Sequence, residues 1–182
     1  VWVGAASVHL ASGWGGASGG CMIHSYPSVY ALGHRAVKDI LLDPVIVQEK
    51  VDGSQISFGR HTTDSRMVLR IRSKGAELQV LAPEKMFATG IAAIQAVEDK
   101  LEPGWVYRGE YLAKPKHNAL AYDRVPQNHI MVFDIEVAPQ AYLPPGLVQA
   151  EAARLEFEVV PTLRQGMLSS VDDFRALLET PS

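Results

Sequence analysis

Short segments of alternating apolar and polar residues constrain the fold of this chain more than any other feature. The segments SQISFGRH (54–61) and MVLRIRS (67–73) alternate clearly, and apolar or β-branched runs recur at VIVQEKV (45–51), WVYRGEYL (105–112) and HIMVFDIEV (129–137). Alternation with a period of two predicts strands with one buried face, and β-branched residues favour strands. We therefore expect a sheet-rich domain in which most strands pair antiparallel.

Turns and helices between these strands define the fold class. Asp52-Gly53 is a strong turn signal that leads into a second antiparallel strand, and Lys74-Gly75 leads into a possible strand at 77–82. The remaining pattern predicts helices at 28–38, 87–101, 145–156 and 170–179 and a short strand at 159–163. Clustered hairpin strands with intervening helices predict an α+β fold and not a doubly wound parallel sheet.

Composition indicates where the protein is located and excludes some kinds of metal or disulfide site. The chain has 182 residues, of which 47% are hydrophobic, and its formal net charge is −3. No apolar run approaches the roughly 18 residues of a membrane span, and the lone Cys21 rules out a disulfide framework or a multi-cysteine zinc site. The histidines show no metal-ligand spacing. We expect a cytoplasmic protein with no membrane partner and no obligate protein partner.

The first 21 residues differ from the rest of the chain. They include 13 Gly, Ala or Ser residues, and no Lys, Arg, Asp or Glu precedes Arg35. They follow neither a helical nor a strand period, and their six glycines make a regular element costly. A secretory signal would need a basic start and a continuous apolar core, which this segment lacks. We expect residues 1–21 to be a disordered or non-native leader before one domain, residues 22–182.

The sharpest motif for chemistry is EKVDGSQ (49–55), in which Lys50 ends a predicted strand and a tight turn follows. A lysine at a strand end is held on a rigid element, and apolar strand neighbours can withdraw its amine from water. Desolvation favours the neutral amine that nucleophilic attack requires. The alternative interpretation is an ordinary surface lysine before a β-turn.

Three further motifs follow Lys50 in order: RIRSKG (70–75), YRGE (107–110) and VFDI (132–135). Together with EKVDGS they resemble the covalent nucleotidyltransferase superfamily of ATP-dependent ligases and capping enzymes, most closely its RNA-ligase branch. The resemblance runs from about Tyr26 to the C-terminus. It implies an ATP-grasp-like nucleotidyltransferase domain with antiparallel sheets and flanking helices, in which Lys50 takes AMP from ATP as a phosphoramide.

The resemblance also assigns roles to individual residues. It implies that the phenylalanine of VFDI stacks on adenine, a contact worth roughly 1–3 kcal/mol, and that Glu110 serves the ribose or a Mg²⁺ or Mn²⁺ ion, with Asp134 as a second candidate metal ligand. Arginine binds oxygens bidentately, which favours Arg72 over Ser73 or Lys74 as the phosphate or ribose contact. The implied nucleotide-binding residues are Glu49, Val51, Asp52, Gly53, Gln55, Arg72, Glu110 and Phe133.

The alternation of side chains along a strand limits which of these residues can face the same site. Asp134 and Glu136 share one parity along their strand and so share one face, whereas Phe133 points to the other face unless a twist or bulge intervenes.

Two features concern the acceptor. DNA ligases and capping guanylyltransferases typically carry arginine two positions after the motif glycine, whereas Gln55 stands there in this chain, and an amide is characteristic of RNA-repair ligases. A polar loop also carries Lys114, Lys116 and Arg124, which can contact RNA phosphates. We expect an ATP-dependent RNA ligase that transfers AMP to an RNA 5′-phosphate and joins it to a 3′-hydroxyl.

Two motifs of the superfamily pattern do not occur after Asp134: an E-G-x-V strand with a metal-binding glutamate, and a K-x-K pair that holds the α-phosphate. We therefore interpret residues 22–182 as the amino-terminal portion of an adenylyltransferase domain and expect weak or no ligation by this chain. Three alternatives remain. They are a DNA ligase or guanylyltransferase of the same superfamily, a non-catalytic module that binds nucleotides or RNA ends, and an unrelated α+β domain with accidental matches.

Overall fold

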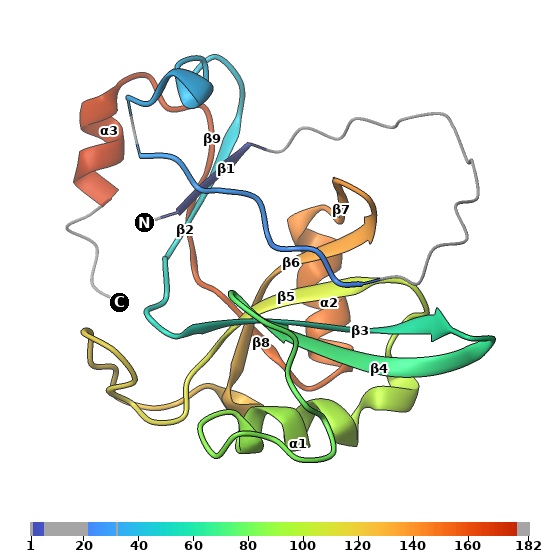
Figure 1. Ribbon diagram of the computed structural model, residues 1–182. Helices are drawn as coiled ribbons and strands as arrows, with labels where there is room; N and C mark the ends of the chain where they lie inside the picture. The colour runs from blue at the N-terminus through green and yellow to red at the C-terminus, as the bar shows by residue number, and fades with distance from the viewer. Residues whose placement is uncertain (1, 6–21, 32, 178–182) are drawn as a thin grey trace. The chain divides into compact units, whose positions relative to one another are not determined.

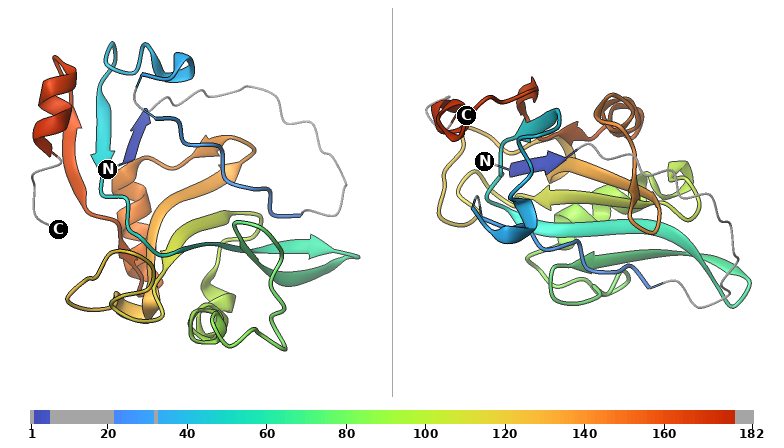
Figure 2. Two further views of the ribbon diagram at one scale, coloured as in Figure 1. Left: turned by 60° about the vertical axis from the view of Figure 1, so that its left-hand side comes forward. Right: turned by 90° about the horizontal axis from the view of Figure 1, so that it is seen from above.

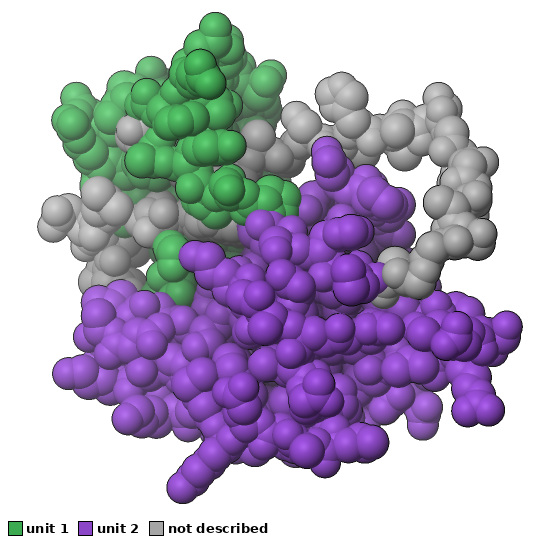
Figure 3. Space-filling model, in the orientation of Figure 1, with its two compact units in different colours: residues 1–8, 27–51, 160–182 green, residues 9–26, 52–159 purple. Residues whose placement is uncertain are grey.

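The computed structural model describes residues 2–5, 22–31 and 33–177 (Figure 1). These residues form two compact units (Figure 3). Unit 1 takes its residues from 1–8, 27–51 and 160–182, and unit 2 takes its residues from 9–26 and 52–159. Unit 2 therefore holds every predicted site residue that follows Val51.

Unit 2 is built on a six-stranded sheet in the order β4-β3-β5-β6-β7, with β8 beside β6. All neighbouring strands are antiparallel except β6 and β8. Strands β3 and β4 form a long hairpin and lie side by side in both views of Figure 2. The bounds are β3 Ser54–Thr63, β4 Arg66–Ser73, β5 Val106–Tyr111, β6 Ile130–Ala138, β7 Ala141–Tyr142 and β8 Glu158–Val159.

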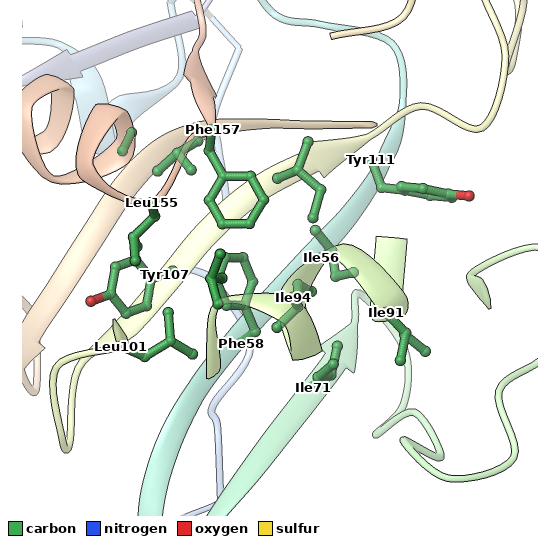
Figure 4. Packing of buried hydrophobic residues seen from close by; sticks show 14 of the residues in the cluster. Ile56, Phe58, Ile71, Ile91, Ile94, Leu101, Tyr107, Tyr111, Leu155 and Phe157 are labelled. Carbon is green, nitrogen blue, oxygen red and sulfur yellow. The ribbon is translucent and has the colours of Figure 1, made fainter. Parts of the chain in front are cut away.

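The hydrophobic core of unit 2 lies between one face of this sheet and two helices, α1 (Ala88–Ala96) and α2 (Pro145–Arg154). The core takes alternate residues from the strands, as the period of two predicts. Figure 4 shows Phe58 of β3 stacked on Tyr107 of β5, with ring centroids 5.3 Å apart, and Phe157 beside them. Because alternate residues face the helices, the residues between them form the opposite, polar face of the sheet.

Unit 1 contains a three-stranded antiparallel sheet in the order β1-β2-β9, formed by Trp2–Ala5, Val45–Gln48 and Thr162–Gly166. Its core includes Val45, Val47, Leu168 and Phe174. The last described helix, α3 (Val171–Ala176), begins at a capping box in which Ser170 and Asp173 satisfy backbone N–H groups of the first turn.

The predicted α+β class with antiparallel sheets is confirmed, and most predicted elements occur near their expected positions. The helix expected at 87–101 is α1, followed by a 3₁₀ turn at Glu98–Lys100. The predicted helix at 28–38 is wrong, because the described residues there contain only a 3₁₀ turn at Arg35–Val37. Gly33, with a φ of +92°, interrupts the helical conformation just before that turn.

The prediction that Asp52-Gly53 joins two paired strands is also wrong. Strand β2 pairs with β1 and β9 in unit 1, whereas β3 pairs with β4 and β5 in unit 2. The possible strand at 77–82 is reduced to a single bridge between Glu77 and Arg72. The strand expected at 159–163 divides into β8 and β9, which belong to different sheets.

The amino-terminal segment holds one unexpected element. We expected no regular structure in residues 1–21, yet Trp2–Ala5 form β1 and pair antiparallel with β2; residues 6–21 lie outside the described part of the chain. Among the described residues, no helix combines the length and apolar character that crossing a membrane requires.

Candidate functional site

The polar face of the unit 2 sheet carries a row of polar side chains across four strands. The strand register places Arg72 of β4, Ser57 of β3, Arg108 of β5 and Asp134 of β6 as successive neighbours, and cross-strand neighbours share a face. Residues two apart on a strand also share a face, which adds the directly paired Gln55 and Glu110. The name polar face is used below for Gln55, Ser57, Arg72, Arg108, Glu110 and Asp134.

Arg108 lies at the centre of the polar face and is only 1% exposed. Its Nη1 donates to the carbonyl oxygen of His24 at 2.6 Å and to Ser57 Oγ at 3.1 Å, and its Nη2 donates to Glu136 Oε2 at 2.5 Å. A buried guanidinium needs partners of this kind to offset its lost hydration. Sequence analysis assigned no role to Arg108, although a cation inside an apolar strand signals buried partners.

A β-bulge turns Phe133 toward the polar face. The register pairs Arg108 with Asp134 and Gly109 with Val132, which leaves Phe133 as the extra residue of β6. The Tyr26 ring lies 5.1 Å from the Phe133 ring, measured between centroids, and the Tyr26 hydroxyl donates to Asp134 Oδ2. Phe133 and Asp134 therefore contact the same side chain, that of Tyr26. A regular strand would point Phe133 and Asp134 to opposite faces, and this bulge is the exception that the sequence analysis allowed for.

The Asp52-Gly53 turn packs directly against β5. A Cβ atom on Gly53 would lie 2.6 Å from the carbonyl oxygen of Tyr111 and 3.2 Å from Glu110 Oε2. Only a glycine lets the turn approach the backbone and the glutamate this closely. The first and third motifs of the resemblance thus meet at Gly53 and Glu110.

The Asp52 side chain anchors the loop that carries the basic residues. Its Oδ2 accepts hydrogen bonds from the backbone N–H groups of Ala119 and Leu120, both at 2.8 Å, and its own N–H donates to Tyr122 Oη at 2.7 Å. Asn118 adds a hydrogen bond to the Gly53 carbonyl at 2.7 Å. A nucleotide contact was expected from Asp52, and its observed partners are groups of this loop.

The three predicted RNA contacts differ in their surroundings. Lys114 and Lys116 are exposed. Arg124 is also exposed, but it forms a bidentate ion pair with Glu158, with both N–O distances at 2.7 Å. The Arg124 charge is therefore largely compensated within the chain.

Glu49, Lys50 and Val51 belong to unit 1. The Glu49 N–H donates to the carbonyl oxygen of Pro161 at 2.9 Å, Val51 is buried, and Lys50 is exposed. Exposure of Lys50 does not support the expectation that apolar neighbours withdraw its amine from water. Lys50 is two residues from Asp52 along the chain, and Asp52 begins the second segment of unit 2.

Burial and neighbouring charges shift the titration of two groups on this side of the sheet. Burial raises the pKa of Asp134 to about 6, although the hydrogen bond from Tyr26 and the charge of Arg108 act in the opposite direction. Burial, followed by the positive charges of Arg70 and Arg108, lowers the pKa of His61. Burial therefore disfavours the charged form of both groups, and the two arginines add to this effect at His61.

The carboxylates fit a magnesium ion only in part. Among the described residues, no cluster of three or more His, Cys, Asp or Glu side chains can hold a metal ion. Asp134 binds Tyr26 and lies near Arg108, and Glu110 lies beside Gly53, which belongs to the turn that follows Lys50. The position of Glu110 beside this turn makes it the better candidate ligand. Magnesium in phosphoryl-transfer sites commonly uses one or two carboxylates together with substrate phosphates, so a single glutamate is sufficient for that arrangement.

The antiparallel α+β fold and a polar face with arginine, carboxylate and aromatic side chains suit a protein that acts on phosphate-containing substrates. The sequence model of the RNA ligase family matches residues 43–180, which is more than half of the chain. The chain therefore belongs to the RNA ligase family, which supports a ligase-type function in joining RNA. The alternative of an unrelated α+β domain is thereby excluded. A comparison with curated proteins found no match.

Proposed function

We propose that this chain carries the nucleotide site of an ATP-dependent RNA ligase, with Lys50 as the covalent nucleophile. The observation that carries the proposal is the common face of unit 2 on which Gln55, Arg72, Glu110 and Phe133 lie, from four different strands. Phosphoryl transfer depends on alignment and charge neutralisation, and residues gathered on one rigid face can supply both.

The reaction begins at the Lys50 amine. Its nitrogen forms a bond to the α-phosphorus of ATP, the bond from that phosphorus to the pyrophosphate oxygen breaks, and pyrophosphate leaves while the amine releases a proton. In the second step a 5′-phosphate oxygen of RNA forms a bond to the AMP phosphorus, the bond from that phosphorus to the Lys50 nitrogen breaks, and the nitrogen takes up a proton. In the third, the RNA 3′-hydroxyl attacks the activated 5′-phosphate, loses its proton and displaces AMP.

The polar face and the adjoining Phe133 supply the binding groups for these steps. Phe133 offers its ring to adenine, and Gln55 and Arg72 offer donors to ribose and phosphate oxygens. Gly53 keeps the turn after Lys50 close to Glu110. A bound Mg²⁺ ion, held by Glu110 and the phosphates, would neutralise charge on the phosphate oxygens.

The loop held by Asp52 supports a role for RNA ends as the acceptor. Lys114 and Lys116 are exposed on this loop, and Ser54 binds His117 of the same loop at 2.8 Å. Asp52, which anchors this loop, is two residues after Lys50 along the chain. An RNA phosphate bound by Lys114 and Lys116 would therefore be held by a loop attached to the Asp52-Gly53 turn that follows Lys50.

The test is incubation of the chain with α-labelled ATP or GTP and a divalent metal, followed by denaturing electrophoresis. We expect a label from ATP only, labile in acid, absent from Lys50→Ala and retained by Lys38→Ala, a matched exposed lysine of unit 1. Added RNA with a 5′-phosphate should become adenylylated more readily than the corresponding DNA. A label from GTP, or equal transfer to DNA, would favour the guanylyltransferase or DNA ligase alternative, and nucleotide binding without any label would favour a non-catalytic module.

A further inference from the structure

We infer that residues His24, Ser25 and Tyr26 form a strap that belongs to the nucleotide site, and that Tyr26 is a positioning residue for the Phe133 ring. The inference rests on the proposed function, because it takes Phe133 as the surface on which the purine stacks. It adds a residue outside all four sequence motifs.

Three consecutive strap residues each contact a different strand of the polar face. The carbonyl oxygen of His24 accepts from Arg108 of β5, Ser25 Oγ accepts from Arg72 Nη2 at 3.0 Å, and the Tyr26 hydroxyl donates to Asp134 of β6. In Figure 1 this segment belongs to the start of the blue chain, near β5 and β6. Contacts with three strands tie the strap to the sheet at three points.

Tyr26 is held at both its tip and its ring. The hydroxyl is fixed on Asp134, and the ring packs edge-on against Phe133, with an interplanar angle of 78° and a centroid distance of 5.1 Å. The Tyr142 ring packs against Tyr26 in the same edge-on manner, with centroids 6.2 Å apart. Two aromatic neighbours and one hydrogen bond restrict Tyr26 to one orientation.

Phe133 is the bulged residue of β6, so it lies outside the register that pairs β5 with β6. Its side chain is aimed by the local backbone and by the groups packed against it, and the Tyr26 ring is one of these groups. Tyr26 also binds the next residue along the same strand, Asp134. Phe133 is accordingly only 8% exposed. A ring held in advance binds a stacked base without the cost of ordering it on binding.

The expected effect follows from the size of an aromatic contact. Removing the Tyr26 ring should weaken ATP binding by about 2- to 12-fold, since edge-on aromatic pairs are worth roughly 0.5–1.5 kcal/mol. The rate of adduct formation at saturating ATP should change little, because Tyr26 acts through Phe133 and does not touch the reacting atoms.

The experiment compares Tyr26→Phe and Tyr26→Leu with Tyr30→Phe, an exposed tyrosine of unit 1 that serves as control. Calorimetry gives the Kd for ATP, labelled ATP gives the adduct at Lys50, and NMR of ¹³C-labelled phenylalanine reports the mobility of the Phe133 ring, assigned with Phe133→Leu. We expect Tyr26→Leu to weaken ATP binding and to loosen the Phe133 ring, Tyr26→Phe to do so less, and Tyr30→Phe to do neither.

The outcomes separate the two proposals. Unchanged ATP binding in Tyr26→Leu, or an unchanged Phe133 ring, would overturn the positioning role, and tighter ATP binding would instead make the strap an inhibitory cover. ATP binding by the unsubstituted chain with no adduct at Lys50 would overturn the covalent function alone. Failure of the unsubstituted chain to bind ATP would overturn both.

Discussion

The buried Arg108 makes the most direct prediction about stability. Arg108→Met removes a guanidinium that is 1% exposed and leaves Glu136, whose side chain is 14% exposed, without its cationic partner. It also frees the Ser57 hydroxyl and the His24 carbonyl from their hydrogen bonds. Removing one partner of a buried ion pair typically costs about 3–5 kcal/mol, because the remaining charge is uncompensated. We expect a loss of this size in the free energy of unfolding.

Urea unfolding followed by far-UV circular dichroism measures this loss. The double variant Arg108→Met/Glu136→Gln removes both charges and should recover much of the stability, because a neutral pair of similar volume is often tolerated. Arg108→Lys keeps the charge but cannot reach three partners, so its stability should fall between those of the parent and Arg108→Met. A cost below about 1 kcal/mol for Arg108→Met, or a double variant as unstable as the two single losses combined, would refute the ion-pair reasoning.

Other predictions concern the neighbouring residues. Burial raises the pKa of Asp134 to about 6, so the folded protein binds this proton more tightly than the unfolded chain and its stability falls as the pH rises from about 4 to about 6. The free energy of unfolding of Asp134→Asn, measured with urea and compared with that of the parent, should therefore increase from about pH 4 to about pH 6 by at most about 3 kcal/mol. The same difference between variant and parent at both pH values would contradict this. Asp52→Ala should speed proteolysis within 113–124, since two backbone N–H groups lose their acceptor, and unchanged cleavage would contradict the anchoring role. Gly53→Ala should cost about 1–3 kcal/mol, whereas Gly75→Ala, which meets no atom within 4 Å, should cost less than about 0.5 kcal/mol; equal losses would contradict the close approach at Gly53.

Local periodicity was sufficient to predict the strands that form the sheet of unit 2. Residues 105–112 and 129–137 contain β5 and β6, as their apolar and β-branched character predicted. In the structure the core residue Tyr107 alternates with the polar-face residue Arg108. Pairing between distant elements was not predictable in the same way. The chain does bend at Asp52-Gly53, but the strands on its two sides, β2 and β3, do not pair with each other because they belong to different sheets.

The motifs predicted candidate residues that the fold brings onto one face of the sheet, whereas contacts between distant segments were not predictable from them. Gln55, Arg72 and Glu110 follow from their motifs and share one face. The bulge at Phe133 depends on a register shift between β5 and β6, which the sequence left open. Tyr26 meets Asp134 across 108 residues of chain, and a pattern of a few residues carries no information about such a contact.

Mass spectrometry of the chain after incubation with ATP and Mg²⁺ tests the central claim most directly. We predict a covalent mass gain of one AMP that maps to the peptide containing Lys50, is absent in Lys50→Ala and is reduced in Glu110→Gln. A chain that binds ATP but gains no AMP, or that carries the AMP on another residue, would contradict the assignment of Lys50 as the nucleophile.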